Sequence, residues 1–251
     1  MIIIKSDSDI RLMRKAGSIT AGALNAAGQS IKPGMSTYEL DAIVEGYIRS
    51  KGAIPSFKGY GGFPGSACIS LNNVVIHGIP SKDIIIREGD IVSVDVGAYI
   101  NGFHGDSAAT FAVGAVPENA LKLMDVTKTS LSKAHEIMKA GVRLGDIGSV
   151  IQTYCESFGF SVVRDFVGHG VGRDLHEDPS VANFGKAGHG LRLPKGATVA
   201  VEPMINEGTH KVFIDRHDGW TVTTADGKLS AHFEHTFYID DECAHILTVQ
   251  E

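Results

Sequence analysis

The chain contains an internal repeat in which each residue of the first copy lies 107 positions before its counterpart in the second. Lys32-Pro33-Gly34-Met35 corresponds to Lys139-Ala140-Gly141-Val142, and the apolar residues that follow keep the same offset. In both copies the apolar positions are spaced i, i+3, i+4 and i+7, which is typical of an amphipathic helix. A repeat of this length indicates two related halves, which we place at about residues 1–113 and 114–251.

The repeat also contains one strand in each half. Gly89 to Asp95 corresponds to Gly196 to Glu202, and each segment is a glycine turn followed by a run rich in β-branched residues that ends in one carboxylate. Longer helices are expected before the two copies, over about 7–30 and 118–139. Helices grouped apart from antiparallel strands make the fold class α+β. We predict a single catalytic domain, residues 1–251, whose halves are related by a pseudo-two-fold axis.

The ends of the repeated helix are marked in the sequence. Ser36 and Glu39 have the spacing of a capping box, in which each side chain accepts a hydrogen bond from the other residue's backbone N–H. Gly52 and Gly159 follow the two copies of the helix, and a glycine in the left-handed conformation commonly ends a helix. We therefore expect each copy of the helix to stop before its glycine.

Four acidic residues are predicted to converge in two similar hairpins. Asp95 and Asp106 flank the turn signal Asn101-Gly102, so they lie on adjacent antiparallel strands and can share one face. Glu202 and Glu234 repeat this plan in the second half, on the outgoing and the returning strand of a longer connection. The matching positions of these acids in the two halves indicate one shared site.

The acidic residues predict a metal site. Buried carboxylates repel one another unless protons or cations neutralise them. Two divalent cations would neutralise the set, and one histidine would complete it. His169 is the candidate because it lies in Gly168-His169-Gly170-Val171-Gly172, where small neighbours let the backbone approach closely. This run lacks the glycine spacing of a dinucleotide-binding loop, so we do not interpret it as one.

The composition fits a folded enzyme-sized protein and argues against several other classes. The chain has 251 residues, 43% of them hydrophobic, and a formal net charge of −6 without a run of Lys or Arg, so we expect no specific nucleic acid as a partner. The apolar run Ile2-Ile3-Ile4 is too short for a signal peptide or a membrane span. Three widely spaced cysteines fit a reducing compartment. We therefore expect a cytoplasmic protein that does not associate with a membrane.

Several motifs together resemble those of the methionine aminopeptidases of type I, in their short bacterial form, over nearly the whole chain. These motifs are Cys68-Ile69-Ser70-Leu71-Asn72, His77-Gly78-Ile79-Pro80, Asp95-Val96-Gly97, Asn101-Gly102-Phe103-His104-Gly105-Asp106, Gly168-His169-Gly170-Val171-Gly172, His176-Glu177, Val201-Glu202-Pro203-Met204, Asp218-Gly219-Trp220-Thr221-Val222 and Glu234-His235-Thr236. The resemblance implies the duplicated pita-bread fold. It also implies metal-dependent hydrolytic removal of the N-terminal methionine from nascent proteins when the second residue is small.

The resemblance implies two divalent metal ions and their ligands. The ligands would be Asp95, Asp106, His169, Glu202 and Glu234. Asp106 and Glu234 would bridge the two ions, and Glu202 would also carry the proton of the attacking water. Co, Mn, Fe and Zn all suit a carboxylate-rich set with one histidine, and the sequence does not choose among them.

The catalytic residues implied by the resemblance are His77, His176 and Glu202. His176 would hydrogen-bond the developing oxyanion, and His77 would contact the amide beyond the scissile bond. For either histidine alone, a packing role would be the default interpretation, and only the surrounding motif favours catalysis. His104 and His232 lie close to ligands in the sequence and are candidates to support them.

The methionine pocket implied by the resemblance consists of Tyr60, Phe63, Cys68, Leu175 and Trp220. The chain departs from the common family pattern at Leu175, where an aromatic residue is common, at Phe63, where tyrosine is common, and at His232, where glutamine is common. The implied substrates are N-terminal methionine peptides of nascent chains. The resemblance also allows a monovalent cation near Asn72, Val74 and Ser230 and association with the ribosome, and we expect a monomer.

Three other functions fit parts of the sequence. An Xaa-Pro peptidase has the same pita-bread fold, but such chains carry a large N-terminal domain that we do not expect here. A non-catalytic binding module on the same fold would not need the five ligands and two histidines. A two-metal phosphoesterase is the third alternative.

Overall fold

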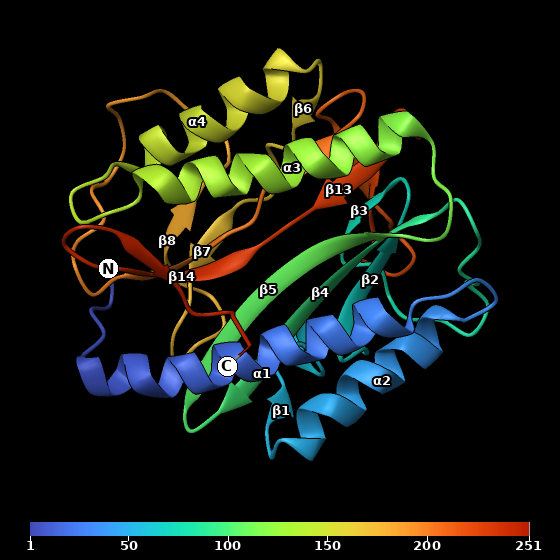
Figure 1. Ribbon diagram of the computed structural model, residues 1–251, viewed down its shortest axis with the longest axis horizontal. Coiled ribbons are helices and arrows are strands. Elements are labelled where there is room, and N and C mark those ends of the chain that lie inside the picture. The colour runs from blue at the N-terminus through green and yellow to red at the C-terminus, as the bar shows by residue number, and fades with distance from the viewer. Residues whose placement is uncertain (251) are drawn as a thin grey trace.

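The two copies of the repeated helix are α2 (Thr37–Ser50) and α4 (Leu144–Ser157), which begin 107 residues apart. Each packs against the longer helix that precedes it, α1 (Asp7–Ser30) or α3 (Glu118–Ile137). The computed structural model describes residues 1–250. Within it, the two helix pairs lie at opposite ends of one face of the β-sheet (Figure 1).

The ends of these helices follow from local chemistry. The Ser36 N–H donates to Glu39 Oε2 at 2.8 Å and the Glu39 N–H donates to Ser36 Oγ at 3.3 Å, so the expected capping box is present. Gly52 (φ 73°) and Gly159 (φ 84°) adopt the left-handed conformation after α2 and α4. Helix α3 ends at Ile137 instead of about 139, because Met138 turns into an extended conformation.

Most strands are short, and the two longest, β4 and β5, form one hairpin. The strands are β1 (Ile54–Pro55), β2 (Ala67–Leu71), β3 (Val74–Ile76), β4 (Ile91–Ile100), β5 (Phe103–Ala112), β6 (Ser161–Val162), β7 (Gly168–Gly170), β8 (Glu177–Val181), β9 (Thr198–Val201), β10 (Met204–Asn206), β11 (Val212–Ile214), β12 (Val222–Thr224), β13 (Ser230–His232), β14 (His235–Ile239) and β15 (Ala244–Ile246). A single 3₁₀ turn, Tyr60–Gly62, follows β1.

The sheet topology differs in detail between the halves. In the first half, β4 pairs with β5 along one edge and with β2 and β1 along the other. In the second half, the strand order is β15-β14-β9-β7-β8. Two smaller sheets, β13-β10-β6 and β11-β12-β3, extend this framework. All the pairings are antiparallel, which agrees with the expected α+β class.

Backbone contacts join the two halves where β5 meets the start of β14. The Glu234 N–H donates to the Ala108 carbonyl at 2.9 Å, and the Ala108 N–H donates back to the Glu234 carbonyl at 3.4 Å. Thr236 Oγ1 donates to the carbonyl of Asp106 at 2.8 Å and accepts the N–H of the same residue at 3.1 Å. These reciprocal bonds place one acidic residue of each half side by side.

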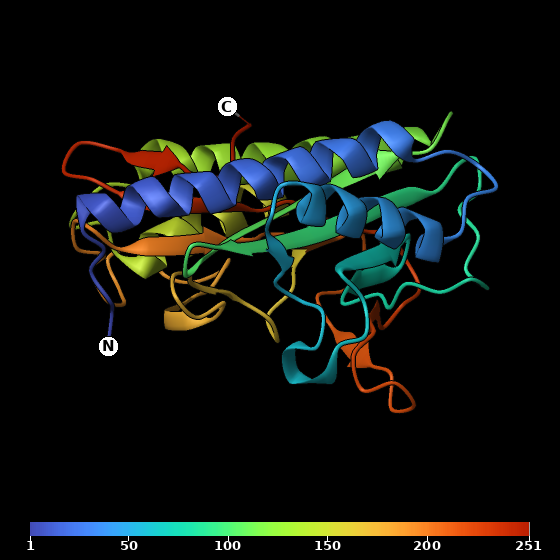
Figure 2. The same cartoon turned by 90° about the horizontal axis from the view of Figure 1, so that it is seen from below.

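The hydrophobic core has two main clusters, one for each half of the sequence. One cluster, from Ile19 to Val113, packs α1 and α2 against β2 and β4. A second cluster, which except for Ile91 lies between Ala120 and Ala244, packs α3 and α4 against β9 and β14. Figure 2 shows the long helices α1 and α3 on one side of the sheet and the longer loops on the other. Among the described residues, no helix is both long and apolar enough to cross a membrane.

Candidate metal and peptidase site

The first pair of acids comes from the β4–β5 hairpin. Asn101 (φ 55°) and Gly102 (φ 84°) form its turn, as the sequence predicts. The register pairs Asp106 with Gly97 and Asp95 with Ala108, so the two aspartates are diagonal neighbours on the same face. Gly97 has no side chain between them. The hairpin therefore presents both carboxylates on one side of the sheet.

The second pair of acids lies in a break between strands. Val201 pairs with His235 and Met204 pairs with His232, so Glu202 and Glu234 stand just outside β9 and β14 and not on them as expected. Pro203 cannot donate a ladder hydrogen bond, which explains why regular pairing stops here. The break frees both glutamates to turn toward the aspartates.

His169 completes the cluster from β7. Its Nδ1–H donates to the Gly170 carbonyl at 2.9 Å, so the neutral ring keeps the lone pair of Nε2 free. Nε2 lies 3.6 Å from Glu202 Oε1 and 3.8 Å from Asp106 Oδ2. Burial lowers the pKa of His169 to about 4, which favours the neutral form that binds a metal. A Cβ at Gly168 or Gly170 would collide with backbone carbonyl oxygens, so the flanking glycines permit this close packing.

The carboxylates are not neutralised by the protein itself. Burial, followed by repulsion from the neighbouring acids, raises the pKa of Asp106, Glu202 and Glu234, and burial raises that of Asp95 to about 7. Asp95 Oδ1, Asp106 Oδ1 and Glu234 Oε1 are buried acceptors without a hydrogen-bond partner. Ligand atoms of Asp106, His169 and Glu234 all lie within 4.8 Å of one another. The donor set and its unpartnered oxygens therefore fit a divalent metal ion.

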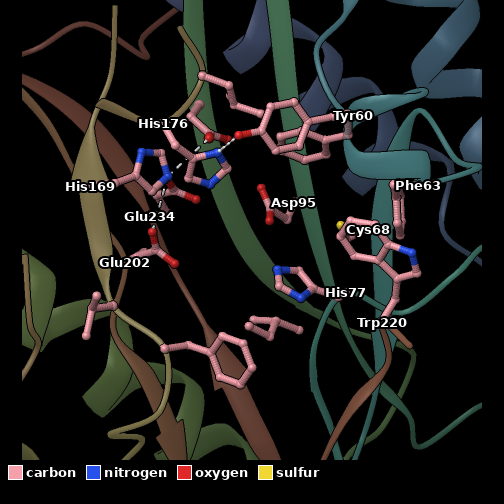
Figure 3. Close-up of a pocket in the computed structure, with 16 residues that line it drawn as sticks. Tyr60, Phe63, Cys68, His77, Asp95, His169, His176, Glu202, Trp220 and Glu234 are labelled. Atoms are coloured by element: carbon pink, nitrogen blue, oxygen red, sulfur yellow. Dashed lines mark hydrogen bonds and ion pairs between the residues drawn. The ribbon is translucent and has the colours of Figure 1, made fainter. Parts of the chain in front are cut away.

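His77 and His176, the two histidines expected to be catalytic, face the same cavity from opposite sides (Figure 3). His176 lies beside His169, with ring centroids 4.0 Å apart, and its Nδ1 is 2.8 Å from Tyr60 Oη. When the tyrosine hydroxyl donates to Nδ1, the His176 Nε2 carries the proton and is free to donate it. His77 lies edge-on to Trp220, and burial lowers its pKa to about 4.

A cavity of about 180 Å³ is lined by the four carboxylates on one part of its wall and by apolar side chains on another. All five residues of the expected methionine pocket line it: Tyr60, Phe63, Cys68, Leu175 and Trp220. Phe63 and Trp220 meet edge to face with ring centroids 5.3 Å apart, and Cys68 lies opposite Asp95 in the β2–β4 register. The cavity therefore brings an apolar wall and a metal-binding set together.

Sequence reasoning missed four residues that also line the cavity: Phe57, Ile76, Phe166 and Val167. Phe166 and Val167 directly precede the Gly168–Gly172 run, and Ile76 directly precedes His77, so proximity to a motif was the available signal. Phe57 lies between β1 and the 3₁₀ turn, where no periodic pattern predicts which way a side chain points.

The two histidines suggested as supports have different surroundings. His232 is buried, and its Nε2 lies 4.0 Å from Glu202 Oε2 and 4.0 Å from Glu234 Oε2. His104 instead has its Nδ1 2.8 Å from Ser56 Oγ, and it is not among the residues that line the cavity. Asn72 lies near Ser230, whose N–H donates to the Asn72 carbonyl at 2.9 Å, so two of the residues suggested for a monovalent cation adjoin.

Comparisons with known proteins agree with this site. The profile of metallopeptidase family M24 matches residues 11–241. A methionine aminopeptidase of Clostridium acetobutylicum is 52% identical over 251 residues, covering 100% of both chains. The methionine aminopeptidase of Thermotoga maritima superposes with a TM-score of 0.97 at 47% identity, over 99% of this chain and 100% of that one. A prolidase of Pyrococcus furiosus superposes at 0.81 with 25% identity, over 99% of this chain and 66% of that one. The predicted pita-bread fold is confirmed.

Proposed function

The chain belongs to metallopeptidase family M24, and from that premise we propose that its site removes the N-terminal methionine from new proteins. The observation that carries the proposal is one cavity whose lining combines apolar side chains with the carboxylates and His169. Methionine is long, unbranched and polarisable, so a cleft with aromatic walls and a thiol suits its side chain. The full-length relatives at about half identity that are named methionine aminopeptidases support this assignment.

In this proposal Asp95, Asp106, His169, Glu202 and Glu234 would hold two divalent ions. When bound, the ions supply positive charge that acidifies a water and polarises the scissile carbonyl. Glu202, at the edge of the cluster, accepts the proton of that water and delivers it to the leaving amine. The substrate's free amine lies on the Asp95 side of the cluster, which restricts cleavage to the first peptide bond.

The two histidines act on the peptide itself. His176 donates its Nε2–H to the oxygen that becomes negative during attack, while Tyr60 holds its Nδ1. His77 contacts the amide beyond the scissile bond. Its low pKa keeps the ring neutral at pH 7, so it contacts the peptide by hydrogen bonding and not by charge.

Further parts of the proposal concern the setting of the reaction. Co, Mn, Fe and Zn all suit the ligands, and a monovalent cation would bind near Asn72, Val74 and Ser230. We propose that the enzyme is a single-domain monomer that acts in the cytoplasm on nascent chains, where association with the ribosome would bring it to its substrates.

A three-substrate comparison tests the assignment against its rivals. With added divalent metal, we expect hydrolysis of Met-Ala-Ser and no comparable hydrolysis of Ala-Pro-Ser or a phenyl phosphate. Faster hydrolysis of Ala-Pro-Ser would support an Xaa-Pro peptidase, because prolidases share the fold. Turnover of the phosphate alone would support a phosphoesterase, and no turnover with any metal would support a binding module.

Removal of metal should inactivate and destabilise the protein. Without cations, the four closely packed carboxylates repel one another and nothing acidifies the attacking water. We therefore expect a strong chelator to abolish hydrolysis of Met-Ala-Ser. Metal at a free concentration of about 100 times its Kd adds about 2.7 kcal/mol of stability, so chelation should lower the melting temperature by roughly 5–10 °C. Calorimetry before and after re-addition of each metal measures this, and full activity in metal-free protein contradicts it.

A further inference from the structure

A buried ion pair lies outside the ligand set. Lys5 Nζ contacts Glu177 Oε2, and the two side chains are only 4% and 2% exposed. Lys5 precedes α1, whereas Glu177 is the first residue of β8. The pair therefore connects the beginning of the first half with the second half, immediately beside His176.

Glu177 organises the turn that carries His176. Its other oxygen, Oε1, accepts the Arg173 N–H at 2.9 Å, so one carboxylate binds both the turn and Lys5. A Cβ at Gly172 would collide with this oxygen and with Lys5 Cε, so the turn wraps around the ion pair with no room for another side chain. The Gly172 N–H also donates to the Asp174 carbonyl at 3.0 Å. Residues 172–177 thus depend on where the Glu177 carboxylate lies.

Lys5 provides a fixed point for that carboxylate. Its N–H donates to the Gly196 carbonyl at 2.8 Å, just before β9, and its Nζ also donates to the Ile3 carbonyl at 3.1 Å. Ser6, the next residue, caps α1 by accepting the Asp9 N–H. The backbone of Lys5 is therefore connected both to α1, the longest helix of the first half, and to the segment that leads into Glu202.

Stability alone does not explain such a pair. Removing two charges from water costs several kcal/mol per ion, and apolar residues of similar size stabilise a fold as well or better. A buried pair does fix the relative positions of two segments, because moving either charge away would leave the other buried without its partner. In this chain the fixed segments are the start of α1 and the turn before β8.

His176 is sensitive to the position of this turn. Its ring is hydrogen-bonded at Nδ1 to Tyr60 and lies beside the His169 ring, while Nε2 faces the reaction centre (Figure 3). A small displacement of the backbone at residue 176 therefore moves the proton donor away from the oxyanion, and misplacement of about 1 Å at such a centre costs up to 10²-fold in rate.

We propose that Lys5 and Glu177 are positioning residues that hold His176 in its reactive orientation. The proposal rests on the proposed function, in which His176 donates to the oxyanion. The pair acts through the backbone of the turn, and neither residue touches the substrate. Breaking the pair should therefore lower kcat only when His176 is present.

A double-mutant cycle tests this dependence in the metal-reconstituted enzyme with Met-Ala-Ser. We expect Lys5→Met to lower kcat on the order of 10-fold with little change in KM, and His176→Ala to lower it on the order of 10²-fold. In the double variant, Lys5→Met should cause no further loss, because the residue it positions is gone. Effects that multiply, or an unchanged kcat in Lys5→Met, overturn the proposal.

Two further variants separate positioning from stability. Lys5→Met combined with Glu177→Gln leaves no unpaired buried charge, so its melting temperature should recover toward the wild type while kcat stays low. Recovery of kcat together with melting temperature would make the pair merely structural. Lys195→Met removes an ammonium that pairs with Asp240 and Asp241 at the surface, and it should leave kcat unchanged. Failure of the wild type to cut Met-Ala-Ser would instead count against the proposed function.

Discussion

Glu202→Gln should lower kcat for Met-Ala-Ser by a factor on the order of 10² or more, the scale of general acid–base catalysis. The substitution keeps the shape of the side chain but removes the basic oxygen that we propose accepts the proton. The backbone at this position is held independently, because Asn183 Nδ2 donates to the Glu202 carbonyl at 3.0 Å. The change therefore acts on the carboxylate and not on the course of the chain.

Metal content must be matched for this result to be informative, because Glu202 is also a proposed ligand. Steady-state kinetics should be measured on wild type and variant with the same number of bound ions per chain. Glu242→Gln, at an exposed position, is the matched control and should leave kcat unchanged. Near-wild-type turnover of Glu202→Gln at equal metal content would remove this residue from the proton-transfer step.

The regular part of the fold could be predicted from the sequence because its signals are local. Asp7–Ser30 is helical over the expected range, and the Asn101-Gly102 turn joins the two strands that it predicts. The apolar spacing of a helix and the turn residues of a hairpin depend only on neighbours within a few positions. Repetition of these signals at one offset then related two segments that are far apart in the chain.

The site could be predicted only in part, because its irregular segments depend on distant contacts. The strand pattern indicated that Glu202 would lie on a strand, but regular pairing stops at Val201. Phe166 and Val167 reach the cavity from a segment without regular structure, so no period in the sequence marks them. The pairing of Lys5 with Glu177 spans 172 positions, and a charge pair at that separation leaves no pattern that a sequence can reveal.

Cleavage should depend steeply on the residue after methionine. We expect fast hydrolysis of Met-Gly, Met-Ala and Met-Ser peptides and hydrolysis slower on the order of 10²-fold for Met-Ile, Met-Lys and Met-Phe. If the methionine side chain enters the apolar part of the cavity, as we propose, the second side chain lies near His77, Phe166 and the carboxylates, which line the same cavity. His77 and Phe166 already meet edge to face with ring centroids 5.7 Å apart, which leaves little room for bulk.

Crowding at this point should act on the rate of attack more than on binding, because a bulky second residue moves the scissile carbonyl relative to His176 and Glu202. A series Met-Xaa-Ser at fixed metal, with kcat and KM measured separately, should therefore show the loss mainly in kcat. Leu-Ala-Ser is the control for the first position, and it should be cut more slowly than Met-Ala-Ser because a branched side chain fits the cleft less well than a flexible thioether. Equal rates for Met-Phe-Ser, Met-Lys-Ser and Met-Ala-Ser, or for Leu-Ala-Ser and Met-Ala-Ser, would make the enzyme a broad aminopeptidase, because the cavity would then select neither residue.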